Sequence, residues 1–206
     1  MARRVFFSFH HEGDILRIGQ IRNSGLTKLG IEEASFIDNA EWESVKQRGK
    51  GAIQNWIDDQ LKGTSVTVVL IGTDTSDREW VEYEIKESFK RGNGLIGIFI
   101  HNVKDLNGKT AKKGKNPITK YRIRNIKTYD WVRDDGYGNL NQWVENAYKQ
   151  AEQRKAEEKQ RKEDAKPVEL DAILGIAMLI GLVIVGLVAL FGGSNKNNGS
   201  NQRFLN

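Results

Sequence analysis

Apolar residues follow two patterns along this chain, short continuous runs and stripes of helical period. The runs at 5–9, 65–71 and 94–100 predict buried strands, because they are short and rich in β-branched and aromatic residues. Residues 34–38 predict a short second strand followed by a loop that carries Trp42, and the alternation over 121–131 predicts a strand at the edge of the sheet. Strands separated by helical patterns indicate an α/β fold with a doubly wound, mainly parallel sheet, and the flavodoxin-like strand order is the expected one.

Helical periodicity fills the segments between these strands. The apolar residues of 50–61 recur at steps of three and four, which predicts an amphipathic helix ended by Gly63. A helix through 15–21 is expected with Asp14 as its N-cap. Another helix is expected to begin at Trp80, and the last begins near Leu140.

The C-terminal third differs in composition from the rest of the chain. Residues 172–191 carry no charge, and twenty residues at a rise of about 1.5 Å span roughly 30 Å, the thickness of the hydrocarbon core of a bilayer. The segment before them is almost entirely charged or polar, with acid-before-base pairs at helical spacing, as in a solvated helix. We therefore predict a globular domain at 1–148, a charged helical stalk at 149–167, a single transmembrane helix at 170–193 and a disordered tail at 194–206.

The charges that flank the uncharged segment predict its orientation. Seven Lys and Arg residues lie between 149 and 166, whereas only Lys196 and Arg203 follow the segment. By the positive-inside rule, the N-terminal domain is then cytoplasmic on a single-pass membrane protein. Ala177 and Gly181 have the small-xxx-small spacing that favours helix pairing, so self-association is a further possibility.

Composition excludes several chemistries. The chain has no cysteine, and its three histidines are too scattered to predict a metal site. The net charge of +5 is modest, and the basic cluster at 109–115 lacks interleaved aromatic residues, so a solvated loop is a better interpretation than a nucleic-acid site. No Gly-rich phosphate-binding loop of the P-loop or dinucleotide-binding type occurs, and no bound cofactor is predicted.

One carboxylate stands where α/β folds bind their ligands. Glu84 follows the apolar strand 65–71 and a short polar loop, and it lies one helical turn after Trp80. Ligands of open α/β sheets bind beyond the carboxyl ends of the strands, which makes Glu84 the candidate catalytic residue. The alternative is a solvated glutamate that complements the helix dipole.

Four segments of the chain carry distinctive motifs: Arg4–His10 (RVFFSFH), Ser65–Gly72 (SVTVVLIG), Trp80–Ile85 (WVEYEI) and Tyr129–Tyr137 (YDWVRDDGY). Together they resemble the TIR-like proteins of bacterial Thoeris anti-phage defence. The likeness spans residues 3 to about 144 and leaves out the stalk and the uncharged segment.

This resemblance implies a flavodoxin-like TIR fold and cleavage of NAD at the nicotinamide–ribose bond. NAD is then a substrate rather than a cofactor, and the product is a cyclic ADP-ribose-type signal sensed by a downstream effector protein. Glu84 matches the catalytic glutamate, and Phe9, His10 and Trp80 match the pocket of the family. Four further residues complete the candidate substrate-binding set: Ser8, Asp38, Trp42 and Tyr83.

A second class of function remains open at this point. TIR domains also serve as non-enzymatic interaction modules, and this chain would then be a scaffold at the membrane with a vestigial site. The match at Glu84 favours the enzyme, whereas the predicted membrane segment departs from the soluble proteins that the chain resembles.

Overall fold

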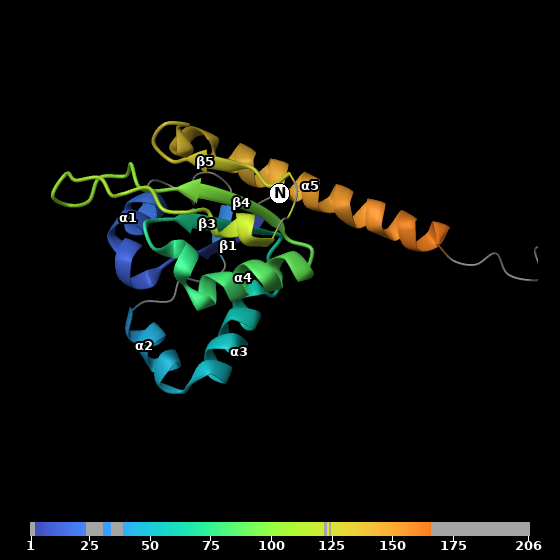
Figure 1. Ribbon diagram of the computed structural model, residues 1–206, viewed down its shortest axis with the longest axis horizontal. Coiled ribbons are helices and arrows are strands. Elements are labelled where there is room, and N and C mark those ends of the chain that lie inside the picture. The colour runs from blue at the N-terminus through green and yellow to red at the C-terminus, as the bar shows by residue number, and fades with distance from the viewer. Residues whose placement is uncertain (1–2, 24–30, 34–38, 122, 124, 166–206) are drawn as a thin grey trace, which may run out of the picture. The chain divides into compact units, whose positions relative to one another are not determined.

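A single parallel sheet forms the centre of the protein. The computed structural model describes residues 3–23, 31–33, 39–121, 123 and 125–165. Five strands lie in the order β2-β1-β3-β4-β5, and every neighbouring pair is parallel (Figure 1). The strands are β1 (Arg3–Ser8), β2 (Ile31–Glu33), β3 (Val66–Ile71), β4 (Gly94–Phe99) and β5 (Thr128–Asp130). The parallel α/β fold predicted from the apolar runs is therefore confirmed, with the flavodoxin-like strand order.

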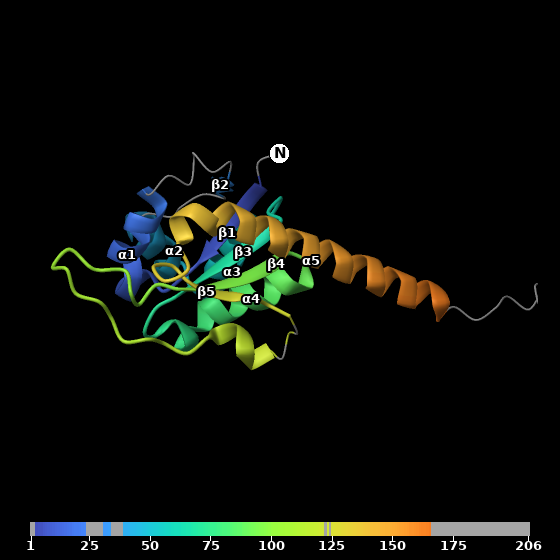
Figure 2. The ribbon, with the colours of Figure 1, turned by 90° about the horizontal axis from the view of Figure 1, so that it is seen from above.

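Helices cover both faces of this sheet, as Figures 1 and 2 show. Residues of α1 and α5 pack on one face, and residues of α3 and α4 pack on the other. The helices are α1 (His11–Asn23), α2 (Asn39–Gln47), α3 (Lys50–Leu61), α4 (Glu79–Lys90) and α5 (Gly136–Asp164), with short 3₁₀ turns at Thr75–Asp77 and Pro117–Tyr121. This arrangement buries the continuous apolar strands from both sides, as expected for a parallel sheet.

Alternation along β1 decides which residue reaches α4. Successive side chains of a strand point to opposite faces, and Val5 and Phe7 pack with the α1 and α5 side. Phe6 packs with the α3 side, so Ser8 shares the face of Phe6. Ser8 is the last residue of β1 and pairs in register with Val69 of β3, which places it at the carboxyl end of the sheet.

Two local predictions were wrong, and a third lies outside the described residues. The second described strand is Ile31–Glu33, and the strand predicted at 34–38 falls on residues that the structure does not describe. The segment with Trp42 is helical rather than a loop, because Trp42 and Val45 are three residues apart and bury one face against α3. Asp14 lies inside α1, which begins at His11, and is not its N-cap.

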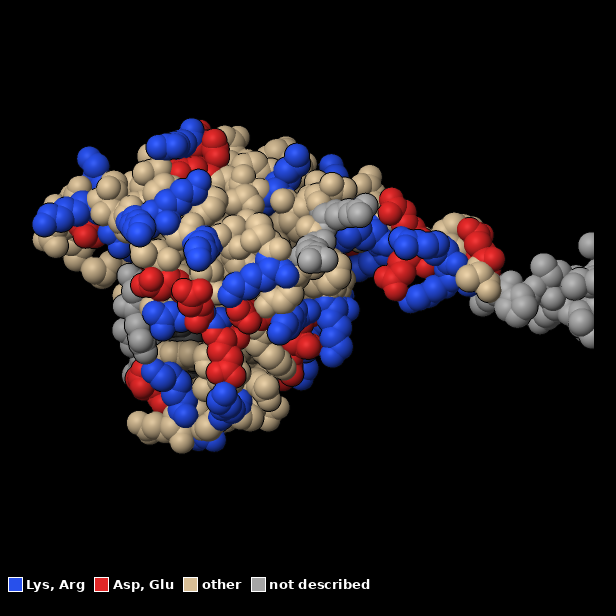
Figure 3. Space-filling model, viewed as in Figure 1, with Lys and Arg blue, Asp and Glu red and all other residues tan. Residues whose placement is uncertain are grey.

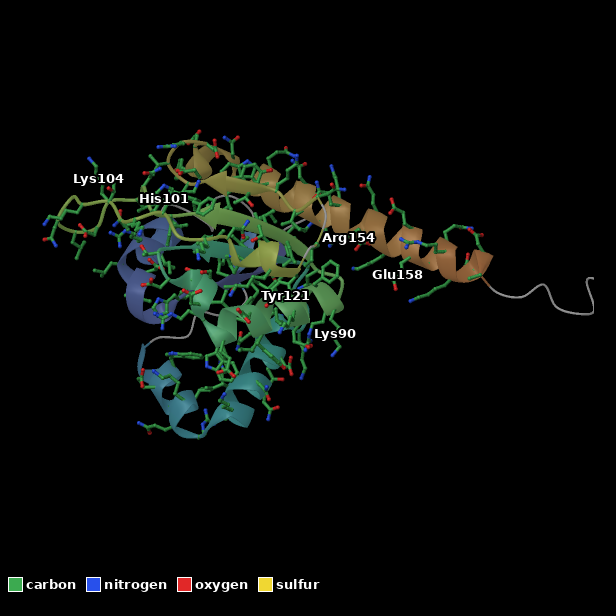
Figure 4. The ribbon with its side chains drawn as sticks, in the orientation of Figure 1. Lys90, His101, Lys104, Tyr121, Arg154 and Glu158 are labelled. Carbon is green, nitrogen blue, oxygen red and sulfur yellow. The ribbon has the colours of Figure 1, made fainter. Side chains whose placement is uncertain are left out.

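The last helix continues well beyond its apolar stripe. In α5, Ala151 is only 1% exposed, and Arg154 donates a hydrogen bond to the carbonyl oxygen of Asn93 at 3.1 Å (Figure 4). The chain divides into two compact units, Met1–Lys159 and Gln160–Asn206. The described part of the chain contains no helix with the length and apolarity needed to cross a bilayer. The predicted transmembrane segment and tail, 170–193 and 194–206, lie outside the described residues, and the predicted domain boundaries stay predictions.

Candidate functional site

A buried carboxyl group joins α4 to the end of β1. The Ser8 hydroxyl donates a hydrogen bond of 2.6 Å to Oε2 of Glu84. Ser8 is fully buried and Glu84 is 7% exposed. Alternation along β1 brings the hydroxyl to this face, and the start of α4 at Glu79 places Glu84 in the second turn, over the β1 end. The sequence separation of 76 residues is closed by the parallel pairing of β1 with β3.

The surroundings of Glu84 disfavour its charged form. Burial raises the pKa of Glu84 to about 8, and the hydrogen bond from Ser8 opposes that rise only in part. Desolvation penalises a carboxylate, whereas donors to it favour ionisation. A carboxyl group that titrates near neutral pH is typical of functional sites, although structural groups share this property.

The neighbouring glutamate, Glu82, has a different environment. Its Oε1 accepts a hydrogen bond of 2.5 Å from Nζ of Lys120, and its side chain is 32% exposed. The Tyr121 hydroxyl lies against the same turn and donates to the carbonyl oxygen of Glu82 at 3.4 Å (Figure 4). The two glutamates are two positions apart on the helix and point in different directions, so Glu82 forms a surface ion pair while Glu84 faces the sheet.

Aromatic side chains gather beside this site on α2, α3 and α4. Trp80 and Tyr83 are partly buried against the α2–α3 cluster, and their rings meet edge to face at 6.3 Å. Trp42 is 9% exposed and makes an edge contact with Trp56 at 6.0 Å. The Tyr83 hydroxyl donates to Oδ2 of Asp58 at 3.2 Å, so this hydroxyl is engaged by α3. Burial followed by the charge of Asp58 raises the pKa of Tyr83.

The remaining sequence-predicted residues are less closely grouped. Phe9 is partly buried against the core on the α1 and α5 side, so it packs with a different cluster from Trp80. His10 is partly exposed between β1 and α1, and its carbonyl oxygen accepts the Asp14 amide at 3.3 Å. Asp38 lies outside the described residues. The structure thus brings together Ser8 and Glu84, with Trp80 one turn away on α4.

Sequence reasoning missed a second polar group at this edge of the sheet. Asp14 of α1 is 5% exposed, and its Oδ2 has no hydrogen-bond partner among the described residues. Its carboxyl lies against Gly72, where any side chain would overlap it. Burial raises the pKa of Asp14, while the charges of Arg17 and Arg78 oppose the rise. The signal available in the sequence was Gly72 itself, directly after the β3 run, since a glycine there permits a close approach.

The long loop after β4 closes over the same edge. Gly114 packs on the backbone of Gly72 and Thr73, and the Thr73 hydroxyl donates to the Lys112 carbonyl oxygen at 2.8 Å.

Basic and acidic side chains are interspersed over α2, α3 and α4 on the face drawn in Figure 3. Within the described ranges, no group of three His, Cys, Asp or Glu side chains is arranged to hold a metal ion. This edge therefore offers two desolvated carboxyl groups, of which Glu84 has one oxygen anchored by Ser8.

The chain is similar in sequence to proteins of a known family. The family described as "Thoeris protein ThsB, TIR-like domain" matches residues 6–105, a range that contains every candidate site residue. A Bacillus cereus (strain MSX-D12) protein named "Putative cyclic ADP-D-ribose synthase ThsB1" is 35% identical over 191 aligned positions, which cover 70% of this chain and 100% of that protein. Among solved structures, the TIR domains of the activated Roq1 resistosome that recognises the pathogen effector XopQ match at 19% identity, with 73% of this chain and 84% of that one covered. Their TM-score is 0.33, and a score this low adds nothing to the fold assignment.

Proposed function

Because the chain belongs to the Thoeris ThsB family of TIR-like proteins, we propose that it cleaves NAD at the nicotinamide–ribose bond and releases a cyclic ADP-ribose-type signal in anti-phage defence. The observation that carries this proposal is the buried Glu84, held by Ser8 at the carboxyl end of the sheet. The name of the B. cereus relative supports the class of product.

The bond to be broken explains why one carboxylate suffices. Nicotinamide leaves NAD as a neutral molecule, so the leaving group needs no proton. The transition state instead resembles an oxocarbenium ion, with positive charge developing on the ribose. A carboxylate in a desolvated site stabilises that charge strongly, because few water dipoles screen the interaction. Glu84 is assigned this role, and Trp80 supplies an aromatic face one helical turn away.

The raised pKa of Glu84 predicts a pH dependence for the free enzyme. At neutral pH the buried carboxyl is largely protonated, since its pKa is about 8. Only the ionised form opposes the developing positive charge. We therefore expect kcat/KM to rise about tenfold for each pH unit below 8 and to level off above it, because kcat/KM reports the titration of the free enzyme.

Two proposals accompany this activity. A downstream effector protein is the proposed receptor of the cyclic product. The C-terminal segment 170–193 is proposed to anchor the chain in a membrane with the N-terminal domain in the cytoplasm, because its stretch 172–191 carries no charge and the flanking charges are asymmetric. Fractionation of cells that express the full chain, or a chain ending at residue 166, tests the anchor. The full chain should resist alkaline extraction from membranes, and the shortened chain should not.

Mass spectrometry of the product tests the proposed reaction. Cells with the protein should accumulate nicotinamide and a cyclic ADP-ribose isomer on phage infection, and cells with Glu84→Gln should accumulate neither. Infected cells with unchanged NAD and no new nucleotide would instead favour the non-enzymatic scaffold.

A further inference from the structure

Ser8 is bonded to only one of the two oxygens of Glu84. Its hydroxyl donates to Oε2 at 2.6 Å, and Oε1 has no hydrogen-bond partner among the described residues. A serine hydroxyl has one proton to donate, and here Glu84 receives it. The carboxyl group is thus anchored through one oxygen, and the other oxygen is left for a ligand.

We propose that Ser8 is a positioning residue that holds Glu84 through Oε2 and thereby directs Oε1 at the ribose, rather than a residue that touches the substrate. This proposal rests on the proposed NAD-cleaving function of Glu84. It also changes the role expected of Ser8, which was among the candidate substrate-binding residues.

The elements that carry the pair support a positioning role. Ser8 is the last residue of β1, whose neighbour in the sheet is β3, so its backbone is fixed by the strand register. The side chain is fully buried, which leaves no exposed surface through which it could reach a bound molecule. Side chains locked by packing on rigid elements are the ones able to hold a reacting group in its productive geometry.

Among the described residues, no charged group contributes to the pKa shift of Glu84. Burial and the Ser8 hydroxyl are the only described influences on its titration. On α4, Glu82 pairs with Lys120, and on α3 Asp58 pairs with Arg91. Loss of the Ser8 hydroxyl should therefore act on Glu84 directly, by removing the one interaction that favours its carboxylate form.

The test compares Ser8→Ala with a matched control, Ser88→Ala. Ser88 is also fully buried, lies on α4 one turn beyond Glu84, and shares a buried hydroxyl hydrogen bond of 2.7 Å with Thr67 of β3. Both variants lose one buried hydroxyl, but only Ser8→Ala loses a partner of Glu84. For Ser8→Ala we expect kcat/KM at pH 7 to fall by roughly 10- to 100-fold, the range for a hydrogen bond to a charged group, with KM nearly unchanged. The rise of kcat/KM with pH should move to higher pH in Ser8→Ala and stay in place in Ser88→Ala.

A second measurement keeps the proposal independent of turnover. The carbon-13 shift of the Glu84 carboxyl, followed through a pH titration, should show a higher midpoint in Ser8→Ala than in the natural protein. If the natural protein releases no nicotinamide, the proposed function fails while this titration still tests the pair. Ser8→Cys keeps the shape with a weaker donor and replaces Ser8→Ala if the alanine variant does not fold.

Two results would overturn the proposal. One is an unchanged Glu84 titration in Ser8→Ala or Ser8→Cys. The other is a raised KM for NAD with an unshifted pH profile, which would make Ser8 a substrate contact.

Discussion

Replacing Glu84 with glutamine should stabilise the protein at alkaline pH. Glutamine has the shape of the protonated carboxyl and its amide oxygen accepts the Ser8 hydrogen bond, but it cannot ionise. The pKa of Glu84 rises from 4.5 to about 8 on folding. An acid whose pKa is raised on folding binds more protons in the folded state between these values, so the stability of the natural protein falls as pH rises through this window.

The size of the effect follows from the two pKa values. At about 1.4 kcal/mol for each pH unit, the interval from 4.5 to about 8 corresponds to a loss of about 5 kcal/mol in the natural protein. For a protein of this size, 1 kcal/mol shifts Tm by about 2–4 °C. Glu84→Gln should therefore melt with the natural protein near pH 4.5 and roughly 10–20 °C above it at pH 9.

Thermal unfolding of the two full-length proteins, followed by circular dichroism at matched pH values, measures this difference. Other titrating groups are common to both proteins and cancel when the Tm values are subtracted. Glu79→Gln is the control, because Glu79 lies on the same helix but its side chain is 64% exposed, in a surface pair with Lys50. A Tm difference between Glu84→Gln and the natural protein that does not change with pH would show that folding does not raise the pKa of Glu84.

Three further predictions concern the packing around the site. Gly114→Ala should lower the free energy of unfolding by about 1–3 kcal/mol in a denaturant titration, since its methyl group would overlap the Gly72 carbonyl. Gly51→Ala, in the open on α3, should instead raise it by about 0.5–1 kcal/mol, and equal effects at the two glycines would contradict the packing. Tyr83→Phe removes the hydroxyl that donates to Asp58 and should lower the free energy of unfolding by about 0.5–1.5 kcal/mol in the same titration. An unchanged free energy of unfolding would show that this hydrogen bond does not form in solution. Trp42→Ala should cost about 3–5 kcal/mol, because Trp42 is 9% exposed, and a cost below 1 kcal/mol would show that α2 does not pack as described.

The strands and long helices were predictable because their signals are local. The run 65–71 is mostly apolar and β-branched and contains β3, and the stripe of 50–61 forms α3 with the same bounds. The second strand could not be predicted, since Ile-Glu-Glu at 31–33 is short and polar and is a strand only through pairing with β1. The helix that carries Trp42 depends in the same way on its contact with α3.

In the candidate site, too, single residues could be identified from the sequence, but contacts between residues far apart in the chain could not. Spacing and the family resemblance singled out Glu84 but gave no partner for it, because Ser8 lies 76 residues earlier. Alternation along β1 would have indicated that Ser8 shares a face with Phe6, toward α3 and α4. Gly72 after the β3 run indicated a close approach, but no local pattern identified Asp14 as its neighbour, since that contact exists only once α1 packs beside the β3 end.

The most direct test of the central claim is nicotinamide release from NAD by the purified full-length protein and by Glu84→Gln, assayed side by side at pH 8.5. At this pH most of the Glu84 carboxyl is ionised, so the natural protein is in its competent form. We expect steady release by the natural protein and none above background by Glu84→Gln, with the two proteins equally folded. Equal release by both proteins would contradict this expectation, because the carboxylate of Glu84 would then have no part in breaking the bond.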